Sequence, residues 1–260
     1  MPEGHTIHRL ALDLERELVG RRLRVSSPQG RFLGASSLDG EPLLGARAVG
    51  KHLFLRFPGC EVHIHLGLFG RFRRHRAPVP APRGQVRMRL ESEELAWDLS
   101  GPTACECLDP DEVAALEARL GADPLSARRR PASLWSTVSR SSRSIGALLL
   151  DQRLFAGVGN VYRAELLFLT GTHPSTPGSA LGKARFERLW TLARELLARG
   201  VEQNRIVTVP GATRRTKKAD ALYVYGRRRC RVCGGAVVVS TSAARKLYHC
   251  PSCQPAPGDT

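Results

Sequence analysis

Four cysteines near the C-terminus constrain the fold of this chain more than any other feature. They form two Cys-x2-Cys pairs that are separated by sixteen residues: Cys230, Cys233, Cys250 and Cys253. Two such pairs place four thiolates around one tetrahedral Zn²⁺, and a site closed by four cysteines indicates a structural metal rather than a catalytic one. Residues 236–239 and 246–248 read as the two strands of a hairpin. The pattern predicts a zinc-bound β-hairpin, with a redox dithiol pair as the alternative.

Three further cysteines, Cys60, Cys105 and Cys107, are scattered through apparent strands. No apolar stretch approaches the ~20 residues that a membrane span needs, and the N-terminus lacks the apolar core of a secretion signal. We therefore expect a cytoplasmic, nucleoid-associated protein without membrane contact. In that reducing compartment the three scattered cysteines are expected to be inert core residues.

The charge of the chain points to a polyanionic partner. Its 260 residues carry a formal net charge of +16, and only five of the 40 basic residues are lysines. Arginine binds phosphate with a planar fork of donors, so nucleic acid is the simplest partner. Binding to a ribosome or to a membrane surface would give the same composition.

The hydrophobic pattern divides the chain into domains. Residues 3–18 form an amphipathic helix, and residues 21–107 contain short alternating runs that predict a sandwich or barrel. Pro- and Arg-rich residues 122–131 read as a hinge. Helical patterns follow at 144–150, 161–169 and 183–198. We predict an α+β multidomain fold with these parts: an N-terminal β-sandwich flanked by helices (1–121), the hinge (122–131), a helical helix–two-turn–helix domain (132–221) and a C-terminal zinc-finger β-hairpin (222–260).

The chain begins Met-Pro-Glu, which suggests covalent chemistry. Methionine before proline is normally trimmed, and an α-amino group has a pKa of about 7.7–8.0, so Pro2 would carry a partly unprotonated amine at neutral pH. Such an amine attacks an electrophilic sugar C1′ and forms an iminium, and Glu3 can then move protons. Taken alone, Pro and Glu at the start of a helix are also ordinary N-terminal residues.

Two internal motifs add candidate residues. Residues 156–160 (Ala-Gly-Val-Gly-Asn) predict a tight turn. Asn160 is expected to cap a helix that begins at residue 161. Its side chain is also expected to donate a hydrogen bond to a DNA phosphate. The alternative is an ordinary helix-turn-helix with a structural cap.

Lys51 stands at the start of a predicted strand, where an exposed lysine is usually a solvated charge. His63 and His65 lie on one strand face, and we expect structural hydrogen bonding there.

Together these motifs resemble the Fpg/Nei family of DNA glycosylases, and the start Met-Pro-Glu-Gly-His-Thr resembles its endonuclease VIII (Nei) branch. The resemblance covers nearly the whole chain. It implies that Pro2 is the Schiff-base nucleophile and Glu3 the proton donor in base release. It also implies that Lys51 is the proton donor for β-elimination and that Arg245, near the tip of the zinc hairpin, serves δ-elimination.

The same resemblance implies contacts to DNA. Asn160 matches a phosphate-binding asparagine, and Arg119 resembles a DNA-contacting arginine at the domain junction. Leu68 and Phe69 align with the loop that fills the gap left by an extruded base, although burial in a strand core is an alternative for Phe69. The implied partner is damaged duplex DNA, with single-stranded and bubble DNA left open. The protein is expected to be a monomer with one structural Zn²⁺ and no organic cofactor.

One departure from the family bears on the substrate. The Fpg branch carries an Arg-Arg-Phe run after an Asp-Pro turn, whereas residues 98–103 here read Asp-Leu-Ser-Gly-Pro-Thr. We therefore expect a bifunctional glycosylase and apurinic/apyrimidinic lyase that removes oxidised bases, with oxidised pyrimidines favoured, and then cleaves by β,δ-elimination. The alternatives are an 8-oxoguanine glycosylase of the Fpg type and a non-catalytic zinc-ribbon DNA-binding protein.

Overall fold

The computed structural model describes residues 2–126, 131–217, 220–242 and 244–258. The chain divides into two compact units. Unit 1 comprises Met1–Glu3 and Ile7–Arg119, and unit 2 comprises Gly4–Thr6 and Leu120–Thr260.

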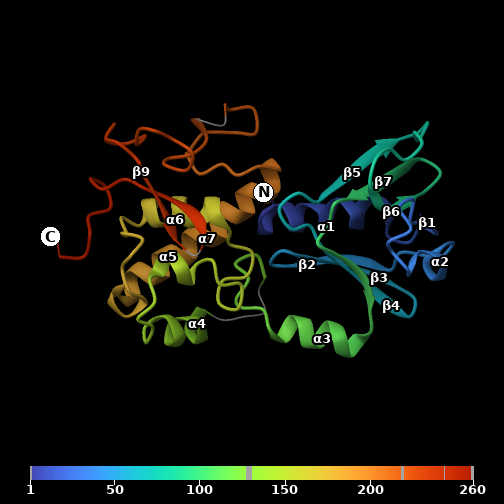
Figure 1. Ribbon diagram of the computed structural model, residues 1–260, viewed down its shortest axis with the longest axis horizontal. Coiled ribbons are helices and arrows are strands. Elements are labelled where there is room, and N and C mark those ends of the chain that lie inside the picture. The colour runs from blue at the N-terminus through green and yellow to red at the C-terminus, as the bar shows by residue number, and fades with distance from the viewer. Residues whose placement is uncertain (1, 127–130, 218–219, 243, 259–260) are drawn as a thin grey trace. The chain divides into compact units, whose positions relative to one another are not determined.

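Unit 1 is a β-sandwich with helices at its borders (Figure 1). Its two antiparallel four-stranded sheets have the strand orders β1-β6-β7-β5 and β2-β3-β4-β8. The strands are β1 (Arg24–Ser26), β2 (Gly45–Val49), β3 (His52–Phe57), β4 (Cys60–His65), β5 (Arg71–Arg76), β6 (Val86–Glu91), β7 (Leu95–Ser100) and β8 (Ala104–Leu108). The helices are α1 (Gly4–Leu18), whose first three residues belong to unit 2, α2 (Ala35–Leu38) and α3 (Pro110–Ala118). The predicted fold class is confirmed here.

The period of each element explains why the sandwich closes. In β3, Leu53, Leu55 and Phe57 belong to the sandwich core, while His52, Phe54 and Arg56 take the alternate positions. Phe54 is buried on that other side against His63 and Arg47. This alternation of period two supplies one apolar face per sheet. Helix α1 adds a stripe of period 3.6 to the same core, with Ile7, Ala11, Leu14 and Leu18 buried. Cys105 is buried in this core, and its burial raises the pKa of the thiol to about 12, which makes it inert as expected.

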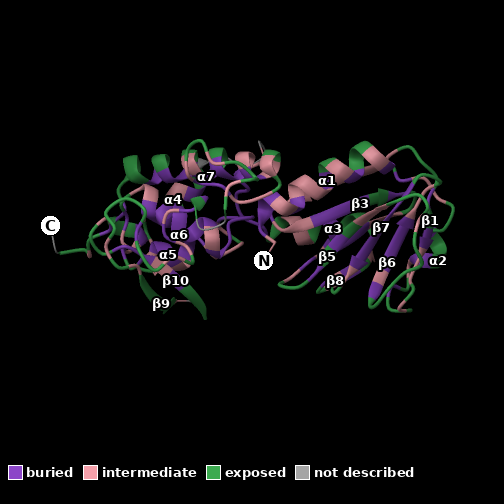
Figure 2. Ribbon diagram, turned by 90° about the horizontal axis from the view of Figure 1, so that it is seen from above, coloured by how far each residue is buried: buried purple, intermediate pink, exposed green. Residues whose placement is uncertain are grey.

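Unit 2 is a helical domain that carries a two-stranded sheet. Its elements are α4 (Pro131–Val138), α5 (Ile145–Leu148), α6 (Asn160–Leu169), the 3₁₀ helix η1 (Gly178–Ala180), α7 (Lys183–Gln203), β9 (Val238–Ser242) and β10 (Arg245–His249). Aliphatic and aromatic residues of α4 to α7 form one core. The hairpin packs on α6 through a small cluster that includes Phe168, Val224 and Cys250. Its outer strand β9 is exposed along most of its length (Figure 2).

A buried carboxylate holds the segment that leads into the hairpin. Glu165 on α6 has no exposed surface. Its oxygens accept hydrogen bonds from the backbone N–H groups of Tyr223, Val224 and Tyr225 at 2.7–2.9 Å and from the hydroxyl of Thr208 at 2.5 Å. A carboxylate is stable without solvent only when its lone pairs are filled in this way. Glu165 therefore anchors residues 223–225 to the helical core.

The structure differs from the sequence-based expectation at the start of α6 and in the expected hinge. Helix α6 begins at Asn160 rather than at residue 161, Gly159 is its N-cap, and no side chain caps it. The prediction of an Asn160 cap is therefore wrong, because its amide bonds the hairpin instead. In the expected hinge, Ala122 and Asp123 are buried and Ala122 pairs with Phe155, while residues 127–130 lie outside the described residues. None of the helices described is long and apolar enough to cross a membrane.

Candidate active site and metal centre

The N-terminal residues lead into α1 at a close approach of two backbones. Glu3 precedes the helix in an extended conformation and is completely buried, whereas Pro2 is partly exposed. The N–H of Gly4 donates to the carbonyl of Gly157 at 2.8 Å, and a Cβ atom on Gly4 would lie 2.8 Å from Cα of Gly157. Only glycine fits at position 4. The start of α1 and the turn at residues 156–160, which are far apart in sequence, therefore meet.

A glutamine holds the turn on the other side of this contact. The Gln152 amide donates to the carbonyls of Leu150 and Val158 at 3.0 and 2.9 Å, and its oxygen accepts from the N–H of Gly157 at 3.0 Å. The φ angle of Gly157 is 93°, a backbone conformation that residues other than glycine rarely adopt. Gln152 thus fixes the turn in the shape that meets Gly4.

Asn160 and Arg163 join the start of α6 to the hairpin of β9 and β10. The Asn160 amide donates to the carbonyl of Lys246 at 2.8 Å, and its oxygen accepts from Arg163 at 2.5 Å. Arg163 has no exposed surface and also donates to the carbonyls of Lys246 and Ser242 at 3.1 and 3.5 Å. Sequence reasoning missed Arg163, because an arginine within a helix gives no sign that it is buried.

Arg245 lies at the start of β10, beside the carbonyl that Asn160 binds, and is exposed. The preceding Ala244 has a φ angle of 57°, so the hairpin turns through a left-handed residue. Asn160 and Arg245 are therefore brought close together within unit 2. The side-chain amide of Asn160 carries two hydrogens, and its bond to the Lys246 carbonyl uses one of them.

Lys51 occupies a two-residue turn between β2 and β3. Val49 pairs with His52 across this turn, and Gly50 has a φ angle of 58°. Glycine supplies the positive φ that such a hairpin needs. The side chain of Lys51 is thereby presented at the end of the sheet next to His52.

Three histidines form a cluster beside Lys51. Nδ1 of His63 lies 3.0 Å from a Glu106 carboxylate oxygen, and its Nε2 lies 2.9 Å from Nδ1 of His52. A carboxylate only accepts, so Nδ1 of His63 donates to it. His65 meets the hydroxyl of Thr103 at 2.8 Å. The expected structural hydrogen bonding is confirmed for both strand histidines.

Burial and the positive charges around His52 keep its imidazole uncharged. Burial, followed by the charges of His65, His63, Lys51 and Arg119, lowers the pKa of His52 to about 3. Burial, followed by the charges of His63 and Lys51, also lowers the pKa of His65. Lys51 and Arg119 therefore both act on His52, which places them in one region of unit 1.

Acid should destabilise the protein through His52. Below pH 6.5 the unfolded chain binds a proton at this residue, whereas the folded chain does so only near pH 3. Stability is therefore lost as pH falls through this window, by up to about 1.4 kcal/mol per pH unit. Urea unfolding at pH 4–7 should give a shallower pH slope for His52→Gln than for wild type, even if the variant is less stable. Equal slopes would show that His52 ionises normally in the fold.

The remaining predicted DNA-contacting residues are exposed. Leu68 and Phe69 lie in the turn between β4 and β5 with 49% and 80% of their surface exposed. Burial of Phe69 in a strand core is therefore wrong. Arg119 follows α3 as its C-cap and is also exposed. Large exposed apolar side chains at a turn have no role in the core that would explain them.

The four C-terminal cysteines come together. Their Sγ atoms all lie within 4.8 Å of one another. The Cys230–Cys253 and Cys233–Cys250 sulfur distances are 3.9 and 3.4 Å. Tetrahedral Zn²⁺ with Zn–S bonds of about 2.3 Å separates its sulfurs by about 3.8 Å. The cluster therefore has the size and donor set to hold one metal ion.

Comparison with known proteins agrees with this geometry. The formamidopyrimidine-DNA glycosylase N-terminal domain matches residues 1–100, and the H2TH domain of the same glycosylases matches residues 120–210. Endonuclease 8 1 of Mycobacterium tuberculosis is 45% identical over 98% of this chain and 100% of the relative. The chain belongs to the formamidopyrimidine-DNA glycosylase and endonuclease VIII family. The predicted endonuclease VIII type is confirmed by this relative.

Other members are more distant. Endonuclease 8 2 of Mycobacterium bovis is 36% identical over 98% of this chain and 100% of the relative. The formamidopyrimidine-DNA glycosylase of Methylococcus capsulatus is 31% identical over 90% of this chain and 89% of the relative. A solved complex of the Lactococcus lactis Fpg with DNA containing an abasic site has a TM-score of 0.83 at 22% identity, covering 98% of this chain and 100% of that one. Membership of this family confirms the prediction of an enzyme of the glycosylase and lyase class.

Proposed function

We propose that this family member removes oxidised bases from DNA, pyrimidines in preference, and then cleaves the strand through a Schiff base on Pro2. The start of the chain carries the proposal. Pro2 is partly exposed, so a substrate can reach its amine, and the adjacent Glu3 carboxyl is completely buried. A carboxyl withdrawn from water beside a nucleophile suits proton transfer. Met1 lies outside the described residues, and its removal remains a prediction.

Base release would follow from these two groups. A damaged base must leave the stack before its sugar can be attacked. The Pro2 nitrogen then bonds to C1′ as the bond to the base breaks, and Glu3 supplies the proton that the departing base needs. Transfer of the Pro2 N–H proton to O4′ then opens the C1′–O4′ bond and gives the iminium between Pro2 and the sugar.

Strand cleavage would use residues elsewhere in the chain. Loss of a C2′ proton breaks the C3′–O bond, with Lys51 as the proton donor to the leaving side. A second elimination breaks the C5′–O bond and leaves a 3′-phosphate. Arginine stays protonated at physiological pH. We therefore assign Arg245 to binding and stabilising a leaving phosphate rather than to moving protons.

DNA binding would involve polar contacts to phosphates and apolar side chains inserted between bases. Asn160 and Arg119 would contact phosphates, which position the duplex without reading its sequence. Leu68 and Phe69 are exposed apolar side chains of the kind that wedges a base step open. The four cysteines would hold one Zn²⁺, which supplies no reaction chemistry and stiffens the hairpin that carries Arg245.

The connection between β7 and β8 supports a preference for pyrimidines. Only residues 101–103 link the two strands, and Gly101 has a φ angle of 62°. Such a short link offers no arginine or phenylalanine side chain to contact the base opposite an oxidised purine.

The lesion preference is tested with matched oligonucleotides. We expect faster single-turnover excision of an oxidised thymine than of 8-oxoguanine, each placed in the same duplex sequence. Excision of 8-oxoguanine at the higher rate would support the Fpg-type alternative. Binding of both duplexes without any cleavage would support the non-catalytic zinc-ribbon alternative.

Replacement of Arg245 should change the products rather than abolish the reaction. In Arg245→Ala the leaving phosphate loses a charged partner, so products should shift from the 3′-phosphate toward the unsaturated aldehyde of β-elimination. Gel mobility of the 3′ ends measures the ratio at saturating enzyme. Arg228→Ala is the matched control, because Arg228 is an exposed arginine that precedes the cysteine cluster. An unchanged ratio in Arg245→Ala would remove Arg245 from the mechanism.

A further inference from the structure

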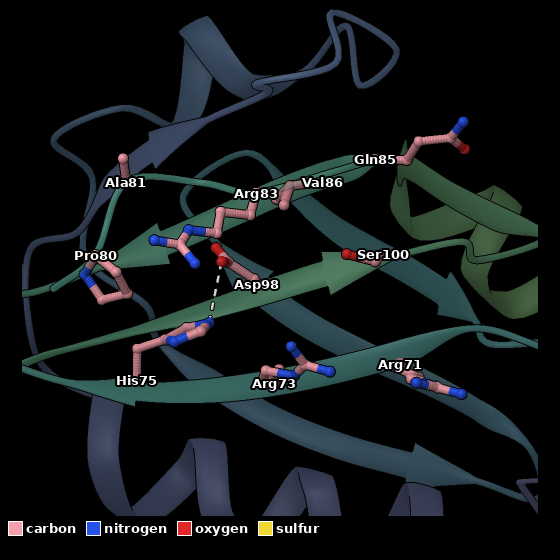
Figure 3. Close-up of a pocket in the computed structure, with 10 residues that line it drawn as sticks. All are labelled: Arg71, Arg73, His75, Pro80, Ala81, Arg83, Gln85, Val86, Asp98 and Ser100. Carbon is pink, nitrogen blue, oxygen red and sulfur yellow. Dashed lines mark ion pairs between the residues drawn. The ribbon is translucent and has the colours of Figure 1, made fainter.

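A concave pocket lies on the outer face of the sheet β1-β6-β7-β5 in unit 1 (Figure 3). It encloses about 520 Å³. Strand β5 contributes Arg71, Arg73 and His75, and strand β7 contributes Asp98 and Ser100. The loop between β5 and β6 forms its other wall with Pro80, Ala81, Arg83 and Gln85. None of the residues assigned to the reaction above lines this pocket.

The side chains of three arginines in the pocket have no partner among the described residues. Arg71, Arg73 and Arg83 are exposed, and none of their guanidinium groups makes a hydrogen bond or ion pair within the part of the chain that the structure describes. Neighbouring guanidinium groups repel one another unless an anion lies between them. The rest of this unit pairs many of its arginines with carboxylates, as Arg47 does with Glu61 at 2.8 Å. Other exposed arginines of the unit, such as Arg24 and Arg31, are solvated singly, whereas Arg71, Arg73 and Arg83 line one pocket together.

The one acidic residue that lines the pocket is already neutralised. Asp98 and Arg89 are both buried and form two parallel hydrogen bonds of 2.6 and 2.8 Å. His75 adds a contact, with Nε2 at 3.1 Å from the second Asp98 oxygen (Figure 3). Asp98 therefore presents little negative charge to a bound anion, and the pocket retains the charge of its three arginines.

The same ion pair builds the wall of the pocket. Arg89 also donates from Nη1 to the carbonyl of Pro80 at 2.9 Å. This bond ties the loop that carries Arg83 to the sheet that carries Arg71 and Arg73. The two sides are thus held in place before a ligand arrives, which lowers the entropy cost of binding.

We infer that this pocket binds the phosphate groups of an oligophosphate chain. The planar forks of arginine match phosphate oxygens. Arg71 and Arg73 are two residues apart on one strand, or about 6.6 Å at ~3.3 Å per residue, so they reach different phosphates of one chain. No Phe, Tyr or Trp side chain lines the pocket to stack on a base, and the His75 ring contacts Asp98. The ligand is recognised by its phosphates, which belong either to a nucleic-acid backbone or to a free oligophosphate.

Binding of inorganic tripolyphosphate to the full-length protein tests the site. By titration calorimetry, Arg73→Gln/Arg83→Gln should bind it at least roughly tenfold more weakly than wild type, because two charged hydrogen bonds are lost. The matched control is Arg31→Gln/Arg194→Gln, which removes the same charge from exposed positions outside the pocket. Equal weakening in both variants, or none in the pocket variant, would overturn the proposal. Unchanged thermal unfolding confirms that the pocket variant is folded.

A second measurement identifies the source of the phosphates. If a DNA backbone occupies the pocket, the pocket variant should lower the slope of log K against log salt for duplex DNA by about 0.9 per lost contact. An unchanged slope, together with lost tripolyphosphate binding, would assign the pocket to a free oligophosphate. Borohydride trapping is measured in parallel. Its failure in the wild type would count against the proposed function and not against this pocket.

Discussion

Blocking the N-terminus with one added residue should abolish borohydride trapping of the protein on DNA that contains an abasic site. The added residue converts the Pro2 amine into an amide, whose nitrogen lone pair is delocalised and is no longer a nucleophile. Trapping should fall to the background of DNA without a lesion. Covalent adducts are measured as shifted bands on a denaturing gel.

The controls separate chemistry from folding. The same residue added at the C-terminus should leave trapping unchanged, since the amine stays free. Pro2→Gly should retain part of the trapping, because it keeps an N-terminal amine. Full trapping with the blocked N-terminus would show that another group is the nucleophile and would remove the basis of the proposed mechanism.

Replacement of Cys250 by serine should remove the metal and unfold the hairpin. Cys250 is buried, and its Sγ atom belongs to the four-sulfur cluster. Structural zinc sites contribute about 10–16 kcal/mol of apparent binding free energy at pH 7, so a hairpin of this size should not persist without the metal. Elemental analysis should find one zinc per wild-type chain and much less in Cys250→Ser. DNA cleavage should fall with it.

Cys60→Ser is the matched control for this change. Cys60 is a half-buried free cysteine in β4, outside the cluster. This variant should keep its zinc, and far-UV circular dichroism should show strands retained in both variants, because unit 1 has its own core. Properly folded wild-type protein that contains no zinc would show that the four cysteines have another role.

The short-range features of this protein were determined by its sequence. The spacing of Cys230, Cys233, Cys250 and Cys253 predicted a cluster, and their sulfurs meet. The alternation in β3 and the helical stripe of α1 predicted which side chains form the sandwich core. These predictions succeed because a tetrahedral metal site and a repeat of two or 3.6 residues depend on neighbours in the chain. Lys51 was expected at the start of a strand, and it lies in the turn directly before β3.

Only the tertiary structure decided what the long-range contacts would be. The Asn160 side chain bonds the carbonyl of Lys246, 86 residues away, and not the helix that it was expected to cap. Arg163 is buried because backbone carbonyls of the hairpin surround it. Arg71 and Arg73 lie on a strand where alternation shows only that they face away from the core. The loop carrying Arg83 turns that face into a pocket, because buried Arg89 bonds its backbone. A charged residue reveals its charge in the sequence, but its partner is fixed only when distant segments pack together.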